Sequence, residues 1–390
     1  MNEKLTLSTL DTLSRAHHTS LKKSIKQAIE KNAGSISFKD YMQMCLYEPG
    51  LGYYSAGRHK LGKGGDFTTA PEISPLFGSS LAENIRQVFD QLNNQDILEF
   101  GAGSGKLAID VVSRLKDVNQ LPRYYFIVEI SADLKQRQQA AISKALPELL
   151  DHFIWIDDIP DQFQGVIIAN EVCDAMPVNI VLSNNGELFE RHVSYKDATF
   201  YWQDASISDA NLLHQTEAIF DEIVLPTYQT EINLTAQYWM ERLGQALQQG
   251  VIFIIDYGYN HQDFYHPERD QGTLQCYFNQ QAHSDPLILA GIQDITAHID
   301  FSKLAEIAQS SRLDVSAYHY QSDFLVAGGI MELASELHTI NDEVSWLQHS
   351  AGLKQLLLPT GMGAEFKVLT LSREITFSPT FLLKDRRHQL

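Results

Sequence analysis

Short apolar segments alternate with amphipathic ones through much of this 390-residue chain, and this alternation constrains the fold more than any other feature. The short, mostly apolar runs lie at 96–100, 124–130, 153–156, 165–169 and 251–256. Helical patterns at 106–115 and 132–145 separate the first three runs. Strands that are apolar on both faces and alternate with helices form parallel sheets covered on both sides. The sequence therefore predicts an α/β fold.

This rhythm breaks after residue 177. Val178–Leu182 and Leu188–Val193 flank Asn184-Asn-Gly186, a combination typical of a β-hairpin. Residues 195–250 are predicted to be a mostly helical insertion. Late strands are predicted at Phe324–Ala327 and Phe366–Leu371.

The chain thus divides into a core and added segments. Residues 1–75 are predicted to form an N-terminal helical segment, helical to about residue 45, followed by a loop on the substrate side. The core comprises residues 76–177 and 251–390, which also hold inserted segments. Residues 178–250 form the hairpin and helical insertion.

A glycine-rich segment, Glu99-Phe-Gly-Ala-Gly-Ser-Gly105, follows the first predicted strand and opens the next helix. Glycine adopts the left-handed backbone of a tight turn without strain, and its missing side chain lets a ligand approach closely. Open α/β sheets bind ligands at the carboxyl ends of their strands, where the strand order reverses. The segment therefore predicts a nucleotide-like ligand, with a purely structural turn as the alternative.

The spacing of the glycines distinguishes two classes of ligand. In the dinucleotide fingerprint the third glycine comes one residue later, at the position of Lys106. Glu99 places a carboxylate before the first glycine, which suits a cationic ligand better than a diphosphate. S-adenosylmethionine carries an amino group and a sulfonium, so it is the expected ligand. Its expected contacts in this loop are Glu99, Gly101, Ala102, Gly103 and Gly105.

Polar residues follow the next three predicted strands. Glu129 ends the second, where an acid can accept hydrogen bonds from both ribose hydroxyls. Asp157 and Asp158 follow the third, where either could contact the adenine amino group or simply cap a turn. Asn170 and Glu171 follow the fourth, beside the expected position of the methyl group.

Further segments resemble the MidA family of S-adenosylmethionine-dependent methyltransferases, relatives of a mitochondrial complex I assembly arginine methyltransferase. They occur in family order from about residue 36 to about residue 372. The main ones are Tyr47-Glu-Pro-Gly-Leu-Gly-Tyr-Tyr54, Gly65-Asp-Phe-Thr-Thr-Ala-Pro-Glu-Ile-Ser74, Ala169-Asn-Glu-Val-Cys-Asp-Ala-Met-Pro177, Asp256-Tyr-Gly258, Asp294-Ile-Thr-Ala-His298 and Gly361-Met-Gly363 with Phe366-Lys367.

The resemblance implies a class I methyltransferase (Rossmann-like) fold, with a mostly parallel seven-stranded sheet and insertions. It also implies protein arginine as the methyl acceptor, with a respiratory-complex subunit as a candidate partner. Val172-Cys173 departs from the family, where an aromatic pair is common, so the acceptor pocket is expected to differ. Two alternatives stay open: methylation of a small molecule or another residue, and a donor-binding scaffold for assembly.

A guanidinium acceptor calls for paired carboxylates, which hold it and localise its charge. Glu171, Asp174 and Asp66 are the candidates for this catalytic role. Asp174 could instead cap a helix start, and Asp66 could cap a loop. The sulfonium is already a good leaving group, so no metal is expected.

Composition narrows the class of protein further. A formal net charge of -19 repels phosphate backbones, which argues against nucleic-acid binding. Three scattered cysteines form neither a disulfide framework nor a zinc motif. No apolar run reaches the length of a membrane span, and the N-terminus lacks the features of a signal or transit peptide. A cytoplasmic location is therefore expected, and the apolar insertions are compatible with a homodimer.

Overall fold

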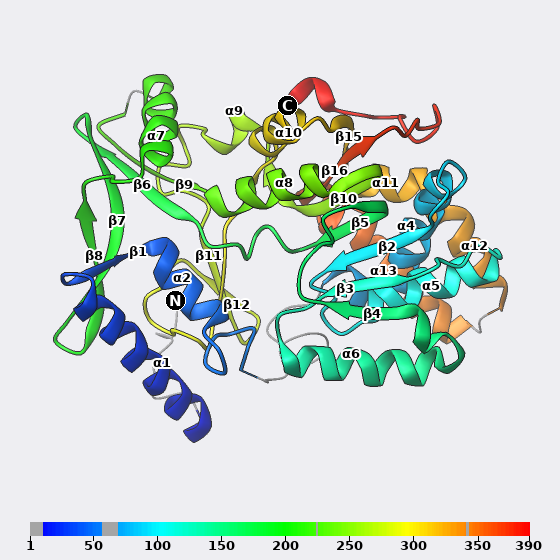
Figure 1. Cartoon of the computed structure of the whole chain (residues 1–390), viewed down its shortest axis with the longest axis horizontal. Coiled ribbons are helices and arrows are strands. Elements are labelled where there is room, and N and C mark those ends of the chain that lie inside the picture. The colour runs from blue at the N-terminus through cyan, green and yellow to red at the C-terminus, as the bar shows by residue number, and fades with distance from the viewer. Residues whose placement is uncertain (1–10, 57–68, 224, 341–342) are drawn as a thin grey trace.

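The computed structural model describes residues 11–56, 69–223, 225–340 and 343–390, which form three β-sheets flanked by helices. In Figure 1 the central sheet lies on the right, and a five-stranded sheet lies at the opposite end of the molecule. The helices of the described residues are α1 (Thr12–Lys31), α2 (Phe38–Tyr47), α3 (Ala70–Ile73), α4 (Pro75–Phe89), α5 (Lys106–Asp117), α6 (Ala132–Ala145), α7 (Ala210–Glu222), α8 (Leu234–Ala246), α9 (His261–Phe264), α10 (Phe301–Ser310), α11 (Gln321–Ala327), α12 (Ile330–Ile340), α13 (Glu343–Leu357) and α14 (Met362–Glu365).

The central sheet has eight strands and mixed pairing, which confirms the predicted α/β class. Seven strands lie in the order β15 (Asp314–Tyr320), β16 (Phe366–Arg373), β10 (Leu247–Tyr259), β5 (Phe163–Asn170), β2 (Asp96–Phe100), β3 (Tyr125–Val128) and β4 (Phe153–Ile156). The short β14 (Ile299–Asp300) pairs with the end of β10. Pairing is parallel from β10 to β4, whereas β16 runs antiparallel to β10 and β15.

The chain order of these strands creates a reversal between β2 and β5. From β2 the chain moves outward through β3 and β4, then returns to the other side of β2 as β5. Ligands of open α/β sheets bind at such a point, beyond the carboxyl ends of the strands. The glycine-rich segment follows β2 directly, so the reversal places it at the centre of this edge.

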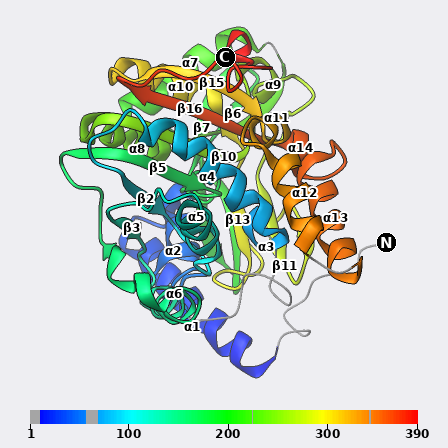
Figure 2. The same cartoon turned by 90° about the vertical axis from the view of Figure 1, so that its right-hand side faces the viewer.

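Alternate residues of the strands face two separate apolar cores. Along β10, Val251 and Phe253 face a core built with α4, α5, α11 and α12. Ile252 and Ile254 face a second core built with α8 and α10. Figure 2 shows α11 and α12 beside α4 on one side of the sheet. Burial on both faces explains why the strand sequences are continuously apolar.

A second body carries the N-terminal helices and two smaller sheets. Its five-stranded sheet contains β1 (Ser35–Ser37), β7 (Glu187–Lys196), β6 (Asn179–Asn184), β9 (Thr227–Ile232) and β8 (Thr199–Ala205). Its three-stranded sheet contains β12 (Gln281–His283), β11 (Gln275–Phe278) and β13 (Asp294–Thr296). Helices α1 and α2 pack on these sheets through an apolar cluster that includes Leu21, Phe38 and Ile180.

The β6–β7 hairpin matches the prediction, but the mostly helical insertion predicted over 195–250 is wrong in part. Strands β8 and β9 lie within it and extend the hairpin sheet. Strand β8 pairs on one side only and exposes most of its side chains, and β9 buries the polar Thr230 and Glu231. Neither strand therefore shows the apolar alternation by which strands are identified.

Two further expectations are corrected. Phe324–Ala327, predicted as a strand, is the end of α11, because a short apolar run fits a buried helix as well as a strand. The predicted N-terminal helices are present as α1 and α2, with β1 between them, and residues 1–10 lie outside the described residues. Helices capable of crossing a bilayer are absent from the described part of the chain.

Candidate active site

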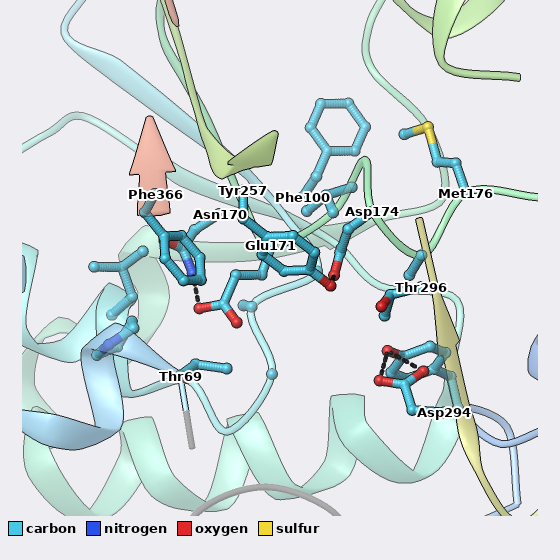
Figure 3. Close-up of a pocket in the computed structure, with 18 of the residues that line it drawn as sticks. Thr69, Phe100, Asn170, Glu171, Asp174, Met176, Tyr257, Asp294, Thr296 and Phe366 are labelled. Atoms are coloured by element: carbon cyan, nitrogen blue, oxygen red, sulfur yellow. Dashed lines mark hydrogen bonds between the residues drawn. The ribbon is translucent and has the colours of Figure 1, made fainter. Parts of the chain in front are cut away.

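A cavity of about 1000 Å³ lies at the carboxyl ends of β2, β3, β5 and β10. Segments from both bodies line it, from Gln43 of α2 to Lys367 of β16. It brings together eight residues predicted from the sequence: Glu99, Gly101, Ala102, Gly103, Glu129, Asn170, Glu171 and Asp174. Figure 3 shows Asn170, Glu171, Asp174 and Asp294 gathered in one part of this cavity.

The glycine loop has the backbone that its sequence requires. Gly101, Gly103 and Gly105 have φ angles of +62°, +53° and +82°. A Cβ atom at Gly101 would meet only Val172, at 3.5 Å, so the space above this glycine is open to a ligand. Gly105 is outside the cavity lining and packs on Gln138, where it begins α5.

Glu99 is only 2% exposed, although it lines the cavity. The hydroxyl of Tyr125 donates a hydrogen bond to Glu99 Oε2 at 2.8 Å. Burial raises the pKa of Glu99 to about 8, and the nearby Glu129 carboxylate adds to this effect. A cationic group bound beside Glu99 would favour its ionised form.

A glutamine from α6 holds the two donor-side elements together. Gln138 Nε2 donates to Gly103 O at 3.0 Å and to Glu129 Oε2 at 2.9 Å. Its Oε1 accepts a hydrogen bond from Trp155 Nε1 at 2.9 Å. Gln138 is fully buried, so these bonds fix the Glu129 carboxylate relative to the glycine loop. Sequence reasoning missed this residue, because nothing in its neighbourhood distinguishes it from the exposed Gln139.

Gly105, Asp157 and Asp158 were also predicted as site residues, but they do not line the cavity. Asp157 and Asp158 are exposed. The side chain of Asp158 is 69% exposed and lies 3.9 Å from Arg242 Nε. Asp66 lies outside the described residues.

Glu171 has a strained backbone and a half-buried side chain. Its φ angle is +54°, which is uncommon for a residue other than glycine. Glu171 Oε1 accepts hydrogen bonds from Ala70 N at 3.4 Å and Asn170 Nδ2 at 3.2 Å. Burial, followed by repulsion from Asp174, raises the pKa of Glu171 to about 8.

Asp174 lies beside Glu171 and is held by two further groups. Its Oδ2 accepts a hydrogen bond from the Tyr257 hydroxyl (Figure 3). Its backbone N–H donates to Asp256 Oδ2 at 3.2 Å. Burial raises the pKa of Asp174 to about 6, and the Tyr257 hydrogen bond opposes the shift.

Asp294 completes a group of three cavity carboxyls and was not identified as a site residue from the sequence. Both of its oxygens accept from the Tyr54 hydroxyl at 3.0 Å. Tyr47 and Tyr277 also line this part of the cavity. Tyr54 and Asp294 are 240 residues apart, so a single sequence gives no signal for their pairing beyond the family-like segments that contain them.

Two buried oxygens test whether the cavity fits the expected methyl donor. Asn170 Oδ1 and Asp174 Oδ1 line the cavity and lack a hydrogen-bond partner among the described residues. A buried acceptor without a donor is unfavourable by about 1–3 kcal/mol, so both are suited to a ligand that donates hydrogen bonds. S-adenosylmethionine offers amino and hydroxyl donors, and the open space at Gly101 admits its close approach.

Comparisons with known proteins agree with this geometry. A family model described as "Putative S-adenosyl-L-methionine-dependent methyltransferase" matches residues 77–319. A crystal structure of a "likely methyl transferase" from Burkholderia thailandensis, bound to S-adenosyl-homocysteine, is 35% identical. It covers 98% of this chain and 99% of its own, with a TM-score of 0.92.

Curated relatives carry more specific names. The Drosophila melanogaster protein named "Protein arginine methyltransferase NDUFAF7 homolog, mitochondrial" is 26% identical over 91% of this chain and 85% of its own. The Homo sapiens protein arginine methyltransferase NDUFAF7, mitochondrial, is 26% identical over 87% of this chain and 81% of its own. Because these names place the relatives in mitochondria, the cytoplasmic location expected from the sequence is contradicted.

Proposed function

The chain belongs to the S-adenosyl-L-methionine-dependent methyltransferase family that matches it, and we propose that it methylates an arginine side chain of a protein. The observation that carries this proposal is the group of three carboxyls, Glu171, Asp174 and Asp294, in one cavity with the glycine loop. The names of the curated relatives support the same acceptor.

A guanidinium suits this group of carboxyls because it is a planar cation with five N–H donors. Repulsion from Asp174 and Asp294 contributes to the raised pKa of Glu171, so an added positive charge would relieve an unfavourable interaction. A neutral acceptor would leave it unrelieved. The tyrosines Tyr47 and Tyr54 give the cavity aromatic walls, against which a guanidinium can also pack.

On the donor side, we propose that Glu129 accepts hydrogen bonds from the ribose and that Glu99 and Asn170 face the amino-acid part. When bound, S-adenosylmethionine would supply a methyl group on a sulfonium, whose sulfur would keep the electron pair of the broken bond as a neutral thioether and need no metal. The residues of the chain align the acceptor nitrogen with this methyl group and exclude water. The acceptor nitrogen gains the methyl group and loses a proton, which Glu171 is positioned to take.

The same proposal extends to architecture and partners. We propose a class I fold in which the seven-stranded path of the central sheet, mostly parallel, binds the donor. We further propose that residues 76–177 and 251–390 form the core with inserted segments, that residues 1–75 form an N-terminal helical segment with a substrate-side loop, and that residues 178–250 are an insertion. We also propose a respiratory-complex subunit as the acceptor and a homodimer as the assembly.

Donor binding is tested by calorimetry with S-adenosyl-homocysteine on two glycine variants. Gly101→Val should abolish detectable binding, because the branched side chain would occupy the ligand's space. Gly186→Val is the matched control, since Gly186 also has a positive φ, +84°, but lies in the open turn of the β6–β7 hairpin. Equal binding in both variants would show that the donor site is assigned wrongly.

The acceptor is tested by co-purification with tagged Glu171→Gln protein, followed by mass spectrometry of methylated arginines in the captured proteins. We expect a captured protein that the unsubstituted enzyme methylates on arginine and the variant does not. Labelled metabolites without a labelled protein would instead support a small-molecule acceptor. Light scattering of the purified protein would measure the assembly.

A further inference from the structure

The cavity contains a buried cation that the proposed chemistry does not use. Lys367 is 9% exposed and lines the cavity, and its Nζ donates to Glu365 O at 2.7 Å. Within the described ranges of the chain, no carboxylate lies within ion-pair distance of this ammonium group. A buried charge is unfavourable unless it is paired, so an unpaired ammonium on a cavity wall is suited to an anion.

Aromatic rings and a second cation lie near Lys367. Its Nζ lies 5.6 Å from the centre of the Tyr259 ring and 5.5 Å from that of Tyr320. The Arg269 guanidinium lies over the Tyr259 ring at 3.9 Å, and the ring of His298 stacks on Tyr259. Lys367 and Arg269 both lower the pKa of His298, which burial brings to about 4, so this histidine is neutral.

The nearby acids do not neutralise Lys367. Glu365 and Asp263 are the acids that favour its charged form, and both are exposed. Burial still lowers the pKa of Lys367 to about 8, with a contribution from Arg269. A bound anion would oppose this shift.

Lys367 lies on the acceptor side of the cavity rather than the donor side. In the antiparallel β10–β16 pair it is opposite Asp256, and its neighbour Phe366 is opposite Tyr257. Strand β16 lies three steps along the sheet from β2, which carries the glycine loop. At about 4.8 Å between strands, this separates Lys367 from the loop's strand by about 14 Å.

We propose that Lys367 forms an anion subsite in the acceptor half of the cavity, which binds a carboxylate carried by the acceptor molecule. This inference rests on the proposed function, because it assigns part of the recognition of the acceptor. A carboxylate suits a single ammonium, whereas a doubly charged phosphate would be repelled by the acids of the same cavity. The carboxylate comes either from an acidic residue beside the methylated arginine or from the α-carboxylate of free arginine.

A methylation assay on a peptide library distinguishes these sources. The library fixes one arginine between randomised positions, and free L-arginine is assayed in parallel. We expect Asp or Glu beside the methylated arginine to be enriched about tenfold or more, a typical effect of one charge-assisted hydrogen bond. Preferential methylation of free arginine, lost in Lys367→Gln, would identify the α-carboxylate as the anion instead.

Charge variants of Lys367 test the subsite through the preference for charged residues beside the methylated arginine. A residue with only a structural role would not change this preference. Lys367→Gln should remove the acidic preference, and Lys367→Glu should reverse it in favour of Lys or Arg. Lys144→Gln is the matched control, because Lys144 is exposed on α6 and outside the cavity lining. The same flanking preference in all of these proteins would overturn the proposal.

A binding measurement separates failure of this subsite from failure of the proposed function. If the unsubstituted enzyme methylates neither peptides nor free arginine, the proposed arginine acceptor is wrong. The anion subsite is then tested separately, by measuring the binding of acetate as a simple carboxylate. Line broadening of carbon-13-labelled acetate, with S-adenosyl-homocysteine present, should show binding about tenfold weaker in Lys367→Gln. Equal acetate binding in the two proteins would overturn the subsite.

Discussion

Glu171 combines two unfavourable features in a single residue. Its left-handed backbone conformation costs of the order of 1–3 kcal/mol, and its half-buried carboxyl group lies near other acids, Asp174 and Asp294. The side chain lies in the cavity, where its Oε1 accepts hydrogen bonds from Ala70 N and Asn170 Nδ2. Strain of this kind persists where the surrounding structure enforces it, most often at functional sites.

Tyr257 controls the charge of Asp174, and this gives a prediction for pH dependence. Its hydrogen bond lowers the pKa of Asp174, so Tyr257→Phe should raise that pKa by about one to two pH units. The variant would hold less of the carboxylate near pH 6, and methylation would fall there and recover at higher pH. A pH–rate profile measures this shift.

Tyr201→Phe is the control for this measurement, because Tyr201 is exposed on β8. Its profile should match that of the unsubstituted enzyme. A uniform loss of rate at every pH in Tyr257→Phe would show that the tyrosine acts through packing and not through the Asp174 charge.

At the residue scale, the site residues that could be predicted were those that belong to contiguous sequence motifs. Glu99 lies near the end of β2, and Gly101 and Glu129 directly follow β2 and β3, so a parallel sheet brings all three to the same edge. Asp157 and Asp158 obey the same rule but follow β4, the outermost strand, where the described structure leaves them exposed. Which strand is outermost is a property of the sheet and is not encoded in the spacing.

At the scale of elements, α6 connects the glycine loop to β3 through Gln138, and this contact is testable. Gln138→Leu should weaken S-adenosyl-homocysteine binding about tenfold, because Glu129 and the loop lose their shared donor. It should also lower stability by about 1–3 kcal/mol, since Trp155 Nε1 loses its acceptor. Calorimetry and thermal unfolding measure the two effects.

The control for α6 is Gln139→Leu, one residue away on the exposed side of the same helix. It should leave both donor affinity and stability within error. Reduced stability with unchanged affinity in Gln138→Leu would show that the bond to Trp155 is structural and that the link to the loop is not needed for binding.

The elements most reliably predicted were those with strong periodicity or a turn motif. The apolar strands β2, β5 and β10 and the Asn-Gly hairpin between β6 and β7 matched the structure. The failures were elements whose identity depends on packing. Phe324 and Leu325 belong to α11 because they pack on the helix side of the sheet, against residues such as Phe253.

At the scale of the whole molecule, buried carboxyls make the stability depend on pH. Burial raises the pKa of Glu99 and Glu171 to about 8, of Asp174 to about 6, and that of Asp256 well above its usual value. Between about pH 4.5 and pH 8 these four carboxyls therefore bind more protons in the folded protein than in the unfolded chain. Their contribution to stability is fully present below this window and is lost as the pH rises through it.

Glu171→Gln should remove one contribution to this dependence. At pH 8 the variant should be more stable than the unsubstituted protein by about 4 kcal/mol, and at pH 4.5 the two should be nearly equal. Thermal unfolding at the two pH values measures the difference. Glu241→Gln, at an exposed position on α8, is the control and should change the stability at neither pH. If the stability difference between Glu171→Gln and the unsubstituted protein were the same at both pH values, the raised pKa assigned to Glu171 would be wrong.

The position of β16 has a consequence for how the protein is made. This strand is the last of the described strands to be synthesised, yet it lies inside the sheet between β10 and β15. Until residues 366–373 leave the ribosome, the facing edges of β10 and β15 have no partner, and unpaired edges invite aggregation or chaperone binding. Lys367 arrives with the same strand, so the cavity becomes complete only after residues 366–373 are made, and a nascent chain that lacks them should be unable to bind its acceptor.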